Sequence, residues 1–271
     1  MIAHPRPLDR HQALSGCGRL ELFDLREPVS AWSHCAGLLL ALPGTLLLWR
    51  RSSGDQPAKR LCLLVFGLSL ASCYAASTLY HALRIPAHRL ALFDRIDRIG
   101  IFVLIAGTYT PLAWSLMRGR WRWGTLTTIW SSTAVASGLL AISGPFPPPL
   151  TTGLYLGMGW GVVVCYTELA RVVSHRALRP LVAGGLFYSV GAVLNLLHWP
   201  VLWPGLFGGH ELFHLFVLGG SLAHYRLMLL VVVPFEPRPD LRPATPFGTV
   251  EPEDSSWSRT YPTCTPVASG R

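Results

Sequence analysis

Apolar residues along this chain gather into seven blocks of about 20 residues, separated by short polar or proline-containing connections. A helix of about 20 apolar residues is long enough to cross the hydrocarbon core of a bilayer. The pattern therefore predicts seven transmembrane helices, at approximately 29–49, 61–83, 96–116, 123–143, 150–170, 181–202 and 210–234. We expect an all-α membrane protein in which residues 29–234 form one seven-transmembrane helical bundle.

Two polar segments flank the predicted bundle. Residues 1–28 form an N-terminal arm without the apolar core and small-residue cleavage site of a secretory signal. Residues 235–271 are rich in Pro, Ser and Thr and poor in aliphatic residues, which is typical of a disordered tail. We therefore expect the first helix to direct insertion, and the protein to reside in the cell membrane (inner or plasma) as a multi-pass protein.

Composition supports a membrane environment and excludes other classes. The chain is 51% hydrophobic and only 14% charged, which is unusual for a soluble domain of this length. Its net charge of +9 is spread over the loops and the tail, so we expect membrane lipids as partners and no nucleic acid. The six cysteines form no C-x-x-C pair, which favours buried packing over disulfides or thiolate ligands. Membrane orientation and oligomeric state stay open.

The last block carries the most chemistry. His210 and His214 stand four residues apart, so on a helix they share one face and can hold one transition metal ion. They also spell H-E-x-x-H, the metalloprotease motif in which the glutamate is the general base. Glu211 points about 100° away from His210 on a helix, so we interpret it as an interfacial or outer residue, with general base as the minor alternative. His224 lies roughly 20 Å beyond His210 and cannot share its metal.

Chain order supplies further polar groups at the same depth. The end of the second predicted helix and the starts of the third and seventh lie on one side of the membrane. Five residues therefore converge near that face: Ser77, His81, Asp97, His210 and His214. So many polar groups inside apolar spans are costly unless they are paired or bind something. Three imidazoles match a zinc site with one open position, the arrangement of catalytic zinc. Asp97 would orient a water molecule or act as general base, and Ser77 would donate a hydrogen bond.

A second polar stripe lies at the start of the first helix. Glu27, Ser30, His34 and Gly37 recur at helical spacing. A carboxylate and an imidazole at a membrane boundary need polar partners. We expect these residues to tie the first helix to its neighbours by hydrogen bonds. In the fifth helix, Gly153 and Gly157 predict a close-packing surface.

Together these motifs resemble the haemolysin III and progestin/adiponectin receptor family of seven-span membrane proteins. The resemblance runs from about residue 27 to 225 and rests on the motifs around Glu27, His81, Asp97 and the H-x-x-x-H pair, with His224. It implies that zinc is bound by His81, His210 and His214, that Asp97 holds the zinc-bound water, and that Ser77 is the family's serine. Ser30 departs from the pattern, because bacterial members commonly have Asn there.

The resemblance and the residues leave three functions open. The leading hypothesis is a zinc-dependent membrane hydrolase of a lipid amide or ester, similar to a ceramidase, with a membrane lipid as its substrate. The alternative is a pore-forming or membrane-perturbing haemolysin whose zinc is structural. The second alternative is a metal- or lipid-sensing membrane protein without turnover.

Overall fold

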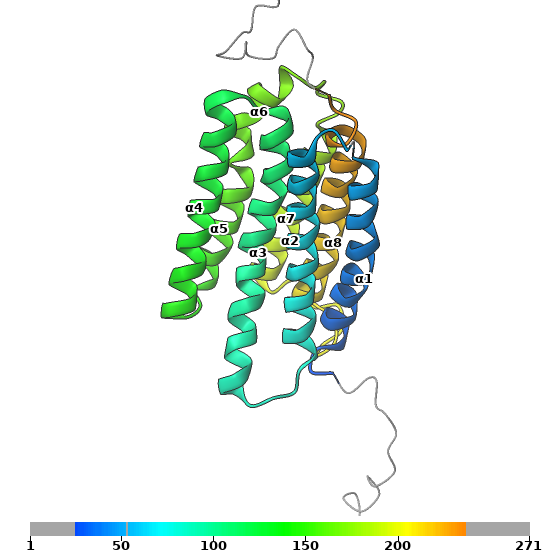
Figure 1. Cartoon of the computed structure of the whole chain (residues 1–271). Helices are drawn as coiled ribbons and strands as arrows, with labels where there is room; N and C mark the ends of the chain where they lie inside the picture. The colour runs from blue at the N-terminus through cyan, green and yellow to red at the C-terminus, as the bar shows by residue number, and fades with distance from the viewer. Residues whose placement is uncertain (1–24, 53, 237–271) are drawn as a thin grey trace, which may run out of the picture. The chain divides into compact units, whose positions relative to one another are not determined.

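The computed structural model describes residues 25–52 and 54–236, and it is helical over most of that length (Figure 1). The predicted N-terminal arm up to residue 24 and the predicted tail from residue 237 lie outside the described residues. In chain order the helices are α1 (Pro28–Arg51), α2 (Pro57–Ala82), α3 (Ala87–Leu116), α4 (Gly119–Ser143), α5 (Pro148–Trp160), α6 (Val162–Ala170), α7 (Arg179–Leu197), α8 (Gly209–Leu227) and the π-helix η2 (Met228–Val232).

Within the described residues, six helical segments are long and apolar enough to cross a membrane. They are α1, α2, α3, α4, α7 and the continuous stretch of α8 and η2. Their bounds follow six of the seven predicted blocks, with two differences. The third helix begins at Ala87, so Asp97 lies inside α3 and not at its mouth as predicted. The sixth ends at Leu197, because His198 adopts a left-handed conformation with φ of 50°.

The predicted fifth span, 150–170, is instead two shorter helices, α5 and α6, which meet at Gly161. The segment ahead of the junction is rich in glycine, which lowers helix propensity. The Tyr109 hydroxyl of α3 lies 2.8 Å from the carbonyl of Met158 and 2.9 Å from that of Gly159, so it donates to helix carbonyls at the break. In a continuous helix, backbone N–H groups would donate to these carbonyls. At the break, the side chain of Tyr109 from another helix donates to them instead.

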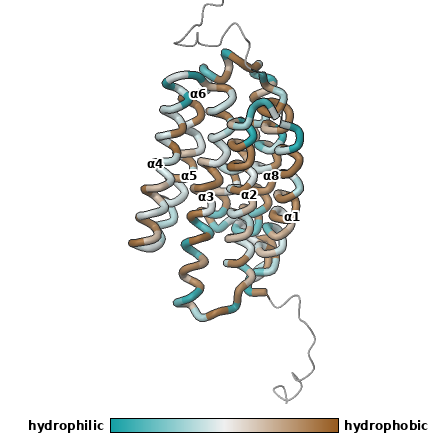
Figure 2. The backbone as a smooth tube through the Cα atoms, in the orientation of Figure 1, coloured by the Kyte–Doolittle hydropathy of each residue, from teal (hydrophilic) through white to brown (hydrophobic). Residues whose placement is uncertain are grey.

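The burial pattern is that of a membrane protein. Large apolar side chains cover the outside of the bundle, including Leu40 at 72% exposed and Ile142 at 85% exposed, whereas His81 and His214 are buried. Figure 2 shows hydrophobic colour along the helices and strong hydrophilic colour near several of their ends. Large apolar side chains on the outside of long apolar helices are the pattern of a bundle surrounded by lipid, so this is a multi-pass membrane structure.

The first three helices are closely packed through small residues. A Cβ at Gly67 of α2 would overlap Thr45 of α1, and a Cβ at Gly107 of α3 would overlap Ser69 of α2. The glycines of α5 behave differently. Nothing lies within 4 Å of the Cβ positions of Gly153 or Gly157, so the prediction that they form a close-packing surface is wrong. Small residues permit close helix contact, but they do not cause it where no neighbour is present.

The end of the bundle remote from the α2–α3 connection contains a buried cation. Lys59 in the first turn of α2 is 3% exposed, and it is the sole lysine of the 271-residue sequence. Its Nζ donates to the carbonyls of Val233 and Phe235, both at 2.9 Å. These carbonyls follow η2, where helix geometry leaves acceptors without intrahelical donors. Lys59 therefore fixes the end of the last helix to the start of α2.

Candidate metal centre

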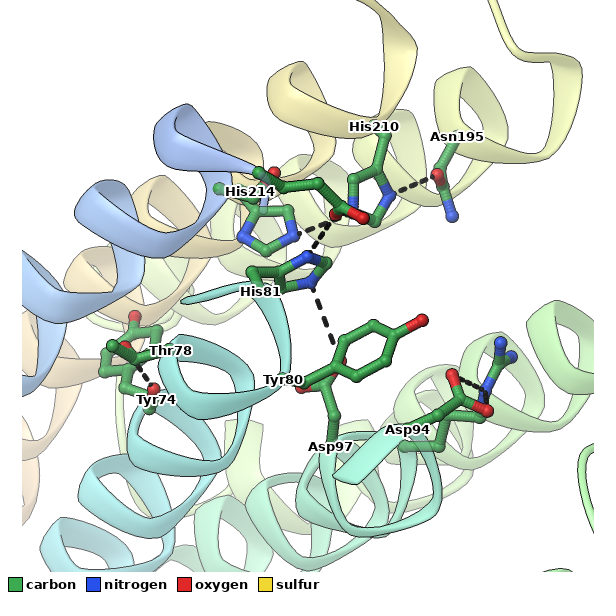
Figure 3. Close-up of polar contacts among 12 residues, drawn as sticks. Tyr74, Thr78, Tyr80, His81, Asp94, Asp97, Asn195, His210 and His214 are labelled. Atoms are coloured by element: carbon green, nitrogen blue, oxygen red, sulfur yellow. Dashed lines mark hydrogen bonds and ion pairs between the residues drawn. The ribbon is translucent and has the colours of Figure 1, made fainter. Parts of the chain in front are cut away.

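The structure brings three histidines of two helices together near one end of the bundle (Figure 3). His81 lies in the last turn of α2, and His210 and His214 lie in the first turns of α8. Each histidine contributes one ring nitrogen, and these three nitrogens all lie within 4.8 Å of one another. His81 and His214 are buried and His210 is partly exposed, so this cluster could hold a metal ion.

The geometry of the ring nitrogens fits a metal ion. The Nε2 atoms of His210 and His214 are 3.2 Å apart. Two nitrogens on one tetrahedral zinc, each at 2.0–2.1 Å, would be about 3.3 Å apart. His81 Nε2 is buried without a hydrogen-bond partner in the described part of the chain. Nitrogens facing one another, with a further orphaned nitrogen beside them, are the donor set that a cation satisfies.

The ring of His81 lies between two carboxylates. Its Nδ1 contacts Oε2 of Glu27, and its Nε2 lies 3.8 Å from Oδ2 of Asp97. Ser77, one turn before His81 on α2, is buried and lies beside the side chain of Asp97. Ser77 and Asp97 therefore lie beside the histidines, and both line the cavity described below.

Two residues outside the predicted set also support α8 at this site. His210 Nδ1 donates to Oδ1 of Asn195 in α7 at 3.0 Å, which leaves Nε2 of His210 free to face His214. The carboxylate of Glu211 accepts a hydrogen bond of 2.8 Å from the backbone N–H of Gly208. Glu211 thus caps its own helix, in agreement with its interpretation as a residue outside the ligand set.

The first-helix stripe contributes more than the sequence indicated. Glu27 contacts His81, and the ring of His34 lies against His214 with centroids 4.0 Å apart. Burial raises the pKa of Glu27, but its hydrogen bond to His81 and the positive charges around it outweigh this effect and bring the pKa below its ordinary value. We expected hydrogen bonds between the first helix and its neighbours, and Glu27 makes one, but its partner is a histidine of the cluster. For Ser30 and His34, which are buried without a hydrogen-bond partner among the described residues, this expectation is wrong.

A largely apolar cavity adjoins the cluster. Its polar end is lined by His34, Ser77, Asp97, His210 and His214, and the remainder by mostly apolar side chains of α3, α5, α6, α7 and α8. Val163 of α6 and Val182 of α7 line it and are also 58% and 41% exposed, so they belong both to the cavity wall and to the outer surface of the bundle. His224 lines its inner part, where Nε2 donates to the Leu181 carbonyl at 3.3 Å, and it stands apart from the three-histidine cluster.

Fold and site together define an integral multi-pass membrane protein in which a three-histidine cluster opens on an apolar cavity. The chain belongs to the family described as haemolysin-III related, whose model matches residues 24–225.

Relatives of the chain include haemolysins and an adiponectin receptor protein. It is 33% identical over 220 residues to Hemolysin-3 of Bacillus cereus, covering 80% of this chain and 96% of that protein. It is 31% identical over 223 residues to a Hemolysin-3 homolog of Bacillus subtilis (strain 168), covering 79% and 99%. The adiponectin receptor protein of Drosophila melanogaster is 26% identical over 220 residues, covering 73% of this chain and 49% of the receptor.

Proposed function

We propose that this protein is a zinc-dependent membrane hydrolase of a lipid amide or ester. The observation that carries the proposal is the juxtaposition of the three-histidine cluster with a carboxylate and an apolar cavity. Three imidazoles with an open fourth position are the ligand set of a catalytic zinc. Nitrogen ligands and a borderline-soft site favour zinc over the oxygen-preferring magnesium and calcium.

The cavity supports a lipid as the substrate. Its wall is predominantly apolar, and its polar groups gather at the histidine end. A hydrocarbon chain would therefore occupy the apolar part while its carbonyl group lies at the histidines. Val163 and Val182 belong both to the cavity wall and to the apolar outer surface, so a membrane lipid would reach the cavity between α6 and α7.

The chemistry would be divided between the metal and the protein. When bound, zinc supplies Lewis acidity, which polarises a carbonyl and makes water a better nucleophile at neutral pH. Asp97, 3.8 Å from His81, would orient the attacking water and accept its proton. Ser77, beside Asp97, would hold its carboxylate by donating a hydrogen bond.

The test combines metal content with lipid hydrolysis. Purified wild type should contain about one zinc per chain, and His210→Ala and His214→Ala should each lose it. His175→Ala, which removes an exposed histidine, is the matched control and should retain it. Asp97→Ala should keep the metal and lose fatty-acid release from a panel of ceramides, esters and other acyl lipids. Stoichiometric zinc in both ligand variants, or no fatty-acid release by wild type, would refute the proposal.

The name of the Bacillus relatives favours one other candidate, a pore-forming or membrane-perturbing haemolysin with a structural zinc. That function predicts leakage from liposomes that does not depend on Asp97. Wild type and Asp97→Ala should therefore be compared in dye-release and erythrocyte-lysis assays. Equal lysis by both proteins, without fatty-acid release, would replace the hydrolase with this candidate.

A further inference from the structure

The segment that enters α1 is bound to the end of α2. The backbone N–H of Glu27 donates to the carbonyl of His81 at 3.0 Å, and that of Arg26 donates to the carbonyl of Ala82 at 3.4 Å. The Arg26 guanidinium donates to the Tyr80 carbonyl at 2.7 Å and lies over the Tyr80 ring, 4.3 Å from its centroid. The main chain of Glu27 is therefore held beside His81.

The carboxylate of Glu27 is held from both sides. Its Oε1 pairs with Nη1 of Arg26 at 3.1 Å, and its Oε2 contacts Nδ1 of His81. Oε2 also lies 4.0 Å from Nε2 of His210, at the edge of the cluster. The pairing with Arg26 orients the carboxylate so that one oxygen is directed at the imidazole.

This contact has a consequence for the proton on His81. A carboxylate accepts from Nδ1 only if Nδ1 carries the proton, and a neutral imidazole then presents a lone pair at Nε2. Nε2 is the nitrogen that is buried without a hydrogen-bond partner among the described residues. His210 follows the same pattern, since its Nδ1 donates to Asn195 while Nε2 faces His214. In both rings Nδ1 contacts an oxygen acceptor, and Nε2 is the nitrogen left to bind a cation.

We propose that Glu27 is a positioning residue of the metal centre, which holds the His81 ring so that Nε2 binds the metal ion. The inference rests on the proposed zinc site and adds to it a residue of the first helix. Acceptors behind a ligating histidine fix its tautomer and raise its basicity, and their loss typically costs 10–100-fold in metal affinity. Asp97 does not duplicate this role, because it lies 3.8 Å from Nε2 of His81, the nitrogen that the proposal assigns to the metal.

The experiment measures zinc affinity without reference to activity. Zinc is titrated against a chelating dye in detergent for wild type, Glu27→Gln and the matched control Glu168→Gln, which alters a carboxylate of α6 that pairs with Arg171. Glu27→Gln should still bind one zinc per chain, with a dissociation constant raised about 10–100-fold. Glu168→Gln should stay within a few-fold of wild type. The visible spectrum of the Co²⁺-loaded protein should show the same tetrahedral coordination in all three.

Two results would overturn the inference. If Glu27→Gln binds zinc as tightly as wild type does, Glu27 does not position His81. An altered Co²⁺ spectrum or complete loss of metal from folded Glu27→Gln would make Glu27 a direct ligand instead. Folding is checked by thermal unfolding of the metal-free proteins, and Glu27→Asp, which keeps the charge but shortens the side chain, gives the same comparison if Glu27→Gln does not fold. If wild type binds no zinc, the proposed function fails together with this inference. If wild type binds zinc and Glu27→Gln binds it equally well, only the role of Glu27 fails.

Discussion

Lys59 offers a direct test of how the last helix is held. In Lys59→Met the side chain keeps its length and apolar stem but loses the ammonium group that donates to Val233 and Phe235. A buried acceptor left without its donor costs about 1–3 kcal/mol. Two carbonyls lose their donor. Phe235 is partly exposed, so water can donate to its carbonyl and offset part of the cost. The free energy of unfolding should therefore fall by about 2–4 kcal/mol.

Two measurements check this prediction. Reversible unfolding in mixed micelles compares Lys59→Met with Arg50→Met, which removes an exposed cation at the same end of the bundle and should change stability by less than about 0.5 kcal/mol. Because Lys59 is the sole lysine, an amine-reactive reagent followed by mass spectrometry reports its exposure directly. Equal stability of the two variants, or labelling of native Lys59 as fast as in unfolded protein, would refute the reasoning.

Three further predictions concern stability. Tyr109→Phe should destabilise the protein by about 1–3 kcal/mol in thermal unfolding, because the carbonyls at the α5–α6 break lose their donor, and an unchanged midpoint would contradict this. Chelation should lower the unfolding midpoint of wild type but not of His214→Ala, because free zinc at 100 times its dissociation constant stabilises the folded protein by about 2.7 kcal/mol. Equal changes of the midpoint in the two proteins would count against the site. Gly67→Ala should cost about 1–3 kcal/mol by overpacking against Thr45. Gly153→Ala should leave the free energy of unfolding unchanged or raise it. A greater loss of stability in Gly153→Ala than in Gly67→Ala would contradict this description of the packing.

Hydropathy alone predicted most of the fold, because spans are defined by length and apolar content. It did not predict the interruption of the fifth block at Gly161, where composition is as apolar as elsewhere. The Tyr109 hydroxyl, which donates to carbonyls at this break, is about 50 residues away in the sequence. Such a contact between helices leaves no periodic signal in either segment. For the same reason, the glycine spacing of α5 did not reveal whether a neighbour was present.

For the site, chain order was the useful signal. It placed Ser77, His81, Asp97 and the α8 histidines at one depth, and the structure brings them together. The same argument applies to Glu27 and Asn195, because the start of the first span and the end of the sixth lie on that side too. They were missed because a carboxylate or amide at a span boundary also suits ordinary hydrogen bonding. In the folded protein, their oxygens reach Nδ1 of His81 and Nδ1 of His210, which the sequence alone does not reveal.

The unequal packing of the bundle gives the cavity one stiff wall and one compliant wall. Helices α1, α2 and α3 interlock at Gly67 and Gly107, so the α2 backbone that carries His81 has little freedom to shift. The opposite wall, at α5 and α6, is interrupted at Gly161 and has glycines that touch no neighbour. We expect hydrogen exchange to be slow in the first wall and fast in the second. The cavity can then exchange its contents by deformation of one side while the geometry of the histidines is preserved on the other.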